Sequence, residues 1–167
     1  VTDVYSTLAA NAAATVDDIA QAMARTASIA NSAGMSFENT SAFLTQMIET
    51  TQESAENIGT SLKTIIARFT ELKKNVAGTA DSEFEDLEYN KVDKALKSVG
   101  VSLKDVNGQF RNLDEVFLEL SKKWSTLDRN TQRYVATIAA GSRQQSRFIA
   151  MMDNYDRTAE LMDKAAN

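Results

Sequence analysis

The sequence contains no histidine, no cysteine and no proline among its 167 residues. Without histidine or cysteine, the chain cannot form a Ser-His-Asp triad, a cysteine nucleophile, a structural zinc site or a disulfide. There is also no glycine-rich phosphate loop, so we expect no catalytic residue, no metal and no cofactor. Proline breaks helices because it lacks a backbone N–H and its ring clashes with the preceding turn. Its absence therefore favours long helices.

Basic charge and long apolar runs are also scarce. The chain has 18 basic and 23 acidic residues, a net charge of −5, and a sequence pI near 4.8. This balance opposes non-specific binding to nucleic acid or to an anionic membrane. No apolar run approaches the ~20 residues that a membrane span needs. The hydrophobic content of 43% is typical of a globular domain. Because the chain begins with Val1, we expect it to be part of a longer polypeptide.

Apolar residues with helical spacing dominate the first half. Thr15 and Asp18 form a capping-box pattern that begins a helix. Gly34 ends the same helix, because glycine readily adopts the left-handed conformation found at helix C-termini. A second apolar stripe keeps helical spacing from Ile58 to Val76 for about five turns. Gly59 lies near the start of that stripe, where another helix could approach closely. The pattern predicts a mainly α fold, a multi-helix bundle.

A small β-hairpin is predicted at about residues 101–111. Gly100 ends a short helix over residues 91–99, and Val101-Ser-Leu103 then alternates as a strand does. Asn107-Gly108 suits a tight turn with positive φ, and Phe110 returns on the second strand. The same turn resembles the opening of a calcium loop, but the twelfth position of that loop is Val116 rather than glutamate. The hairpin turn is therefore the favoured interpretation.

An acidic stretch divides the chain. We predict an N-terminal helical half at residues 1–76, an acidic linker at 77–90, and a C-terminal helical half at 91–167. A calcium loop opening at Asp81 would need glycine at its sixth position and glutamate at its twelfth, where the sequence has Asp86 and Val92. A solvated linker explains the carboxylates better.

Two other groups of polar residues could have a function. Arg143 and Arg147 flank two glutamines just after Gly141. They could form a contact surface for a partner or another subunit, or Gly141 could kink a helix while Arg143 bonds freed carbonyls or an acidic group. We favour the kink. Glu49, Glu53 and Glu56 could suggest a cell-wall hydrolase, but no apolar pocket is evident to raise a carboxyl pKa, so a solvated helix face is preferred.

The order of these segments resembles the core region of tape measure proteins from tailed phages and prophages of Gram-positive bacteria. The resemblance covers about residues 16–152 and is sharpest at Ala140-Gly-Ser-Arg-Gln-Gln-Ser-Arg-Phe148. The other matching segments are Glu56-Asn-Ile-Gly-Thr-Ser-Leu-Lys-Thr-Ile-Ile-Ala-Arg-Phe69, Lys91-Val-Asp-Lys-Ala-Leu-Lys-Ser-Val-Gly-Val-Ser-Leu-Lys-Asp105, Gly108-Gln-Phe-Arg-Asn-Leu-Asp-Glu-Val116 and Lys122-Lys-Trp-Ser-Thr-Leu127.

The resemblance implies a virion structural protein that sets tail length and assists DNA ejection. It implies location in the tail lumen, and in the host cytoplasm during assembly. The implied partners are tail assembly chaperones, the tail tube protein and distal tail or baseplate proteins; self-association is a further expectation. The family brings no catalytic residue to this region, so Gly59, Gly100, Gly108, Gly141, Arg143 and Arg147 are expected to have structural or contact roles. The alternative is a helical adaptor or secreted effector module.

Overall fold

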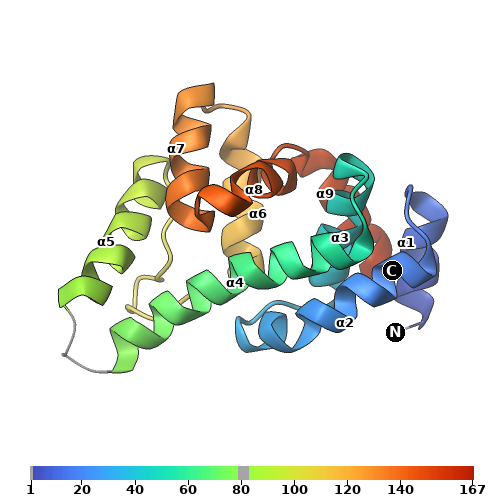
Figure 1. Cartoon of the computed structure of the whole chain (residues 1–167), viewed down its shortest axis with the longest axis horizontal. Helices are drawn as coiled ribbons and strands as arrows, with labels where there is room; N and C mark the ends of the chain where they lie inside the picture. The colour runs from blue at the N-terminus through green and yellow to red at the C-terminus, as the bar shows by residue number, and fades with distance from the viewer. Residues whose placement is uncertain (1, 79–82) are drawn as a thin grey trace.

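A computed structural model describes residues 2–78 and 83–167, with side chains for residues 3–70 and 91–167. Within these ranges the chain folds into α-helices and one short 3-10 helix (Figure 1). The first four helices are α1 (Thr2–Asn11), α2 (Val16–Ser32), α3 (Phe37–Thr51) and α4 (Ala55–Gly78). The remaining elements are α5 (Glu83–Ser98), α6 (Leu113–Trp124), α7 (Arg129–Ala140), η1 (Ser142–Gln144), α8 (Gln145–Met152) and α9 (Tyr155–Ala166). The prediction of a mainly α bundle is confirmed.

The long helix α4 spans the molecule and packs along α2 (Figure 1). One end of the bundle holds α1 and α9, which contact each other and bring the two chain termini close together. The other end holds α5 and α7, which also contact each other. Between these ends, α3, α6 and α8 form the centre of the bundle. None of the described helices combines the length and the apolar character needed to cross a membrane.

Aromatic rings join helices from the two predicted halves. Phe117 of α6 meets Phe43 of α3, Phe69 of α4 and Phe148 of α8 edge to face, with ring centroids 6.1, 5.4 and 6.2 Å away. Trp124 adds a tilted edge contact to Phe148 at 6.0 Å. All five side chains are buried. Edge-to-face pairs stabilise a core beyond the area they bury, so this cluster fixes how the four helices pack.

The helix ends follow the local sequence. The Thr15 hydroxyl accepts the Asp18 N–H at 3.0 Å, and the Asp18 carboxylate accepts the Thr15 N–H at 3.1 Å. This confirms the predicted capping box. Beyond α2, Gly34 has φ +78°, a left-handed conformation that glycine adopts without strain. The chain can therefore reverse direction between α2 and α3.

The predicted β-hairpin at residues 101–111 is wrong. This described segment has one isolated antiparallel bridge, between Lys104 and Phe110, and no strand. The Asp105 carboxylate accepts the N–H groups of Asn107 at 2.9 Å and Gln109 at 3.0 Å, which closes the loop locally. Side-chain hydrogen bonds of this kind compete with ladder pairing. Since α6 begins at Leu113, the returning chain is also too short to extend a second strand.

The predicted acidic linker at 77–90 overlaps two helices. Helix α4 continues to Gly78, and α5 begins at Glu83, well before the short helix expected at 91–99. Residues 79–82, including Asp81, lie outside the described residues. The division of the chain into two halves stays a prediction.

Candidate functional site at the end of α3 and the Gly141 bend

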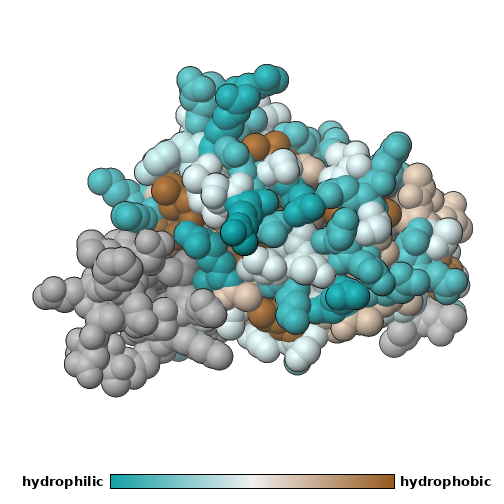
Figure 2. Space-filling model, in the orientation of Figure 1, coloured by the Kyte–Doolittle hydropathy of each residue, from teal (hydrophilic) through white to brown (hydrophobic). Residues whose placement is uncertain are grey.

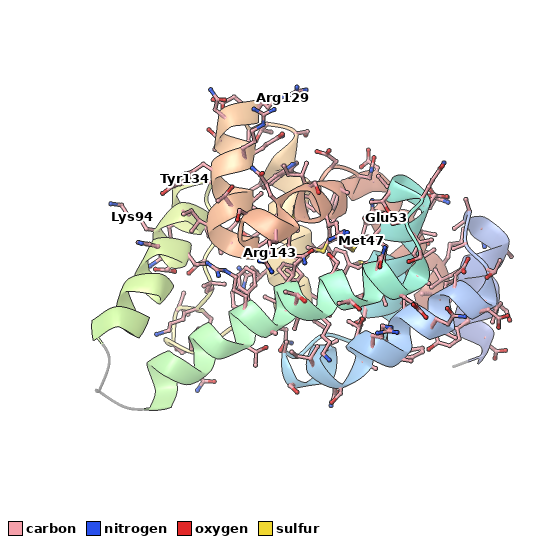
Figure 3. The ribbon with its side chains drawn as sticks, viewed as in Figure 1. Met47, Glu53, Lys94, Arg129, Tyr134 and Arg143 are labelled. Atoms are coloured by element: carbon pink, nitrogen blue, oxygen red, sulfur yellow. The ribbon has the colours of Figure 1, made fainter. Side chains whose placement is uncertain are left out.

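Three of the polar side chains singled out in the sequence, those of Glu49, Glu53 and Arg147, lie where α3 turns into α4. Gln52 ends α3 with φ 56°, a left-handed conformation uncommon outside glycine. This turn presents Glu49 and Glu53 to the helices that follow Gly141, and Figure 3 shows Glu53 beside the end of α3. The site is therefore built from segments far apart in the sequence.

Arg147 binds both carboxylate oxygens of Glu53 through two guanidinium nitrogens, and we call such a bidentate ion pair a clasp. Its Nε lies 3.0 Å from Oε2 and its Nη2 lies 2.9 Å from Oε1. Arg147 Nη1 also donates to the Gln144 amide oxygen at 3.3 Å, and the same oxygen accepts the Ser61 hydroxyl at 2.6 Å. The bidentate hydrogen bonds from Arg147 hold the pKa of Glu53 below its usual value. The start of α8 is thereby tied to α4 and to the turn before it.

A second clasp joins Glu49 to Arg157 of α9. The guanidinium Nε lies 2.9 Å from Oε2, and Nη2 lies 2.8 Å from Oε1. Arg157 also donates to the backbone oxygen of Asn11, and Glu49 accepts the Ala13 N–H at 3.2 Å. Hydrogen bonding to Arg157 is the main cause of the lowered pKa of Glu49, although partial burial opposes it. This clasp holds the end of α1 and the start of α9 against α3.

Gly141 bends the chain between α7 and η1. Its φ of +84° and ψ of 158° end α7, and its N–H donates to the Thr137 oxygen at 2.9 Å. Arg143 is exposed and makes no hydrogen bond or ion pair with any residue that the structure describes (Figure 3). The acidic group near the bend is instead bound by Arg147. The acidic partner expected for Arg143 is therefore bound by Arg147, four residues later.

The other glycines serve separate contacts. A Cβ on Gly59 would lie 2.7 Å from the oxygen and 2.9 Å from the Cα of Ala22, so α2 and α4 cross closely there. The Thr26 hydroxyl bonds the Gly59 oxygen at 3.0 Å across the crossing. Gly100 has φ +81°, and its oxygen accepts Lys123 Nζ at 2.6 Å. Gly108, with φ +77°, turns the loop described above.

The side chains of this site hold helices together, and its carboxylates are not suited to acid catalysis. A carboxyl that acts as a general acid needs a raised pKa, whereas those of Glu49 and Glu53 are lowered by arginine. Glu56 makes only an exposed contact with Arg25, at 3.7 Å. In the described part of the chain, no cluster of three or more acidic side chains could hold a metal ion. The roles of Arg157 and Ser61 are not predicted from the sequence, because their partners Glu49 and Gln144 lie 108 and 83 residues away along the chain. The only local signal is the four-residue spacing of Glu49 and Glu53, which places both carboxylates on one side of the chain.

Comparison with known proteins finds tail proteins of phages. Residues 1–141 match a family described as phage-related minor tail protein. A protein named "Tape measure protein" from Pneumococcus phage Dp-1 is 26% identical over 167 residues, which cover 100% of this chain. The chain spans only 13% of the length of that relative. No solved structure matches the chain.

Proposed function

The chain belongs to the phage-related minor tail protein family, and on that premise we propose that it is one module of a tape measure protein. Family membership gives it a structural role in a phage tail. The finer proposal is that the parent protein sets tail length during assembly and assists DNA ejection. The observation that carries it is the alignment of the whole chain with a small part of a tape measure protein.

The site supports a structural role for this module. Both carboxylates that could suggest hydrolysis, Glu49 and Glu53, are bound bidentately by arginines. We propose that the module has no enzymatic activity, and a zymogram on cell walls tests this. A cleared band that disappears in Glu49→Gln or Glu53→Gln would reject it.

The proposed partners are tail assembly chaperones, the tail tube protein and distal tail or baseplate proteins. The module would meet the chaperones in the host cytoplasm and the tube protein in the tail lumen, where copies would also associate with one another. The net charge of −5 supports contacts with protein rather than with nucleic acid.

The ruler role predicts a length change measurable by electron microscopy. Deleting or duplicating the 167-residue module in the parent protein should shorten or lengthen tails, by up to roughly 250 Å if every residue adds a helical rise of ~1.5 Å. The control is the parent protein with the Gly59→Ala substitution, which keeps the chain length and disturbs only helix packing. It should build tails of normal length. Unchanged tails in both the deletion and the duplication would reject the ruler role.

A further inference from the structure

One stretch of this acidic chain carries charge of a single sign. Residues 129–152 contain four arginines and no aspartate or glutamate. Arg147 is committed to Glu53, which leaves Arg129, Arg133 and Arg143, all exposed. We call these three residues the α7 arginine face. They follow α7 from its first turn to the bend beyond its end, a length of about 18 Å at the helical rise per residue.

The α7 arginine face is not explained by the stability of the fold. None of its three guanidinium groups makes a hydrogen bond or ion pair within the described residues. Arg129 stands in the first turn of α7, where the helix dipole disfavours a cation. Arg133 follows one turn later on the same side. Exposed positive charge that opposes the dipole and has no internal partner fits a role in binding.

Asp153 is one carboxylate that lies beside this surface. Arg129, Gln132, Arg133, Ile149 and Asp153 line a depression of about 230 Å³ between α7 and α8. Arg129 interacts with Asp153 only through space, and the two form no ion pair. A second carboxylate, Asp128, precedes Arg129 and accepts the Thr131 N–H at 2.7 Å as the N-cap of α7. Two carboxylates beside three arginines leave part of the positive charge uncompensated.

The surroundings of the face resemble a protein interface. Tyr134, next to Arg133, leaves 56% of its surface exposed. Lys94 of α5, the helix beside α7, is also exposed, and Figure 3 shows it on the same side of the molecule as Tyr134. In Figure 2 the outer end of α7 is covered by hydrophilic side chains. Tyrosine and arginine are both enriched at protein interfaces.

We propose that the α7 arginine face binds an acidic helix of a partner protein. Arg129 and Arg133 lie one turn apart on α7 and therefore fit carboxylates one turn apart on another helix, because each guanidinium can bind a carboxylate with two parallel hydrogen bonds. Arg143, beyond the bend, adds a third positive charge after the end of α7. Duplex DNA is the less suitable ligand, since the whole chain carries a net charge of −5 and three arginines provide little counter-ion release. The inference does not depend on the ruler role.

The test compares two variants of the full chain with equal loss of charge. The first combines Arg129→Gln, Arg133→Gln and Arg143→Gln. The control combines Lys63→Gln, Lys122→Gln and Lys164→Gln, three exposed lysines on other helices. Fluorescence anisotropy would measure binding to a labelled alanine-rich helical peptide with glutamate at every fourth position, and to duplex DNA of equal total charge. We expect the arginine variant to bind this acidic helical peptide about tenfold more weakly than the unmutated chain does. The lysine variant should bind it nearly as well as the unmutated chain.

Each other outcome overturns the proposal. Equal weakening in both variants would mean that only net charge matters. Tighter binding to duplex DNA than to the acidic helical peptide would identify phosphate as the ligand. Self-association that disappears in the arginine variant would identify a second copy as the occupant. A clear drop in the melting temperature of the arginine variant would show that the arginines stabilise the fold.

Discussion

At the scale of single residues, two carboxylates at the end of α3 hold three other segments in place. Glu49 binds Arg157 of α9 and the backbone after α1, while Glu53 binds Arg147 of α8. The four side chains are between 25% and 33% exposed, so water screens the pairs only in part. Bidentate geometry is the condition under which such pairs contribute measurably to stability.

Replacing Glu49 by glutamine should destabilise the chain by about 1–2 kcal/mol. The change removes the charge-assisted bonds to Arg157 and weakens the link between α1 and α9. Urea unfolding followed by circular dichroism would measure the loss. Glu160→Gln is the matched control, because Glu160 contacts the same arginine at 3.3 Å but is 55% exposed. The control should cost less than about 1 kcal/mol, and equal losses would contradict the role of Glu49.

The two clasps also predict acid sensitivity. The folded-state pKa values of Glu49 and Glu53 lie below the ordinary value of 4.5. Their contribution to stability is therefore complete above pH 4.5 and is lost as pH falls through the lowered values. A variant with Glu49→Gln and Glu53→Gln should be less stable at pH 6 and lose less stability between pH 5 and 3. Unfolding midpoints measured across this pH range would show the smaller loss of stability in the variant. Parallel curves for the variant and the unmutated chain would refute the predicted acid sensitivity of the two clasps.

At the scale of elements, local signals predicted helices well and the loop poorly. The capping box at Thr15 and the apolar stripe through Ile58, Leu62 and Ile65 depend on neighbours in sequence, and the structure has both. The predicted hairpin is absent because the Asp105 carboxylate accepts hydrogen bonds from backbone N–H groups of its own loop. These bonds compete with strand pairing. The partners of Glu49 and Glu53 could not be predicted, since each pairing depends on how distant helices pack.

Gly59 makes a sharp prediction about helix packing. Glycine to alanine inside a helix ordinarily stabilises by up to about 1 kcal/mol. At Gly59 the new methyl would lie under 3 Å from the backbone of Ala22, which no side-chain movement can relieve. We expect Gly59→Ala to destabilise by about 1–3 kcal/mol through overpacking. Thr60→Ala, at an exposed neighbouring position on α4, is the control and should be near neutral. A stabilised Gly59→Ala would disprove the close crossing.

At the scale of the whole molecule, the two predicted halves share one core. Every residue from Thr40 to Ile48 is buried, so α3 is covered on all sides. Helices of the N-terminal half (α1, α2 and α4) and of the C-terminal half (α8 and α9) both contact it. The buried Asp114 of α6 adds a polar link, accepting the Ser36 N–H and the Asn39 side chain at 3.0 Å each. Connections of this kind make the halves interdependent.

The shared core predicts that neither half folds alone. Residues 1–80 would leave α3 without α8 and α9, exposing Met47 and the buried amide of Gln46, which donates to the Ala150 oxygen at 3.0 Å. Residues 81–167 would lose Phe43 and Phe69 from around Phe117. We therefore expect each fragment to lack a cooperative thermal transition by circular dichroism. A mixture of the two fragments should regain a cooperative thermal transition, because each fragment supplies the contacts that the other lacks. The intact chain should unfold in a single calorimetric transition; two separate transitions, or folded fragments, would instead establish two independent halves.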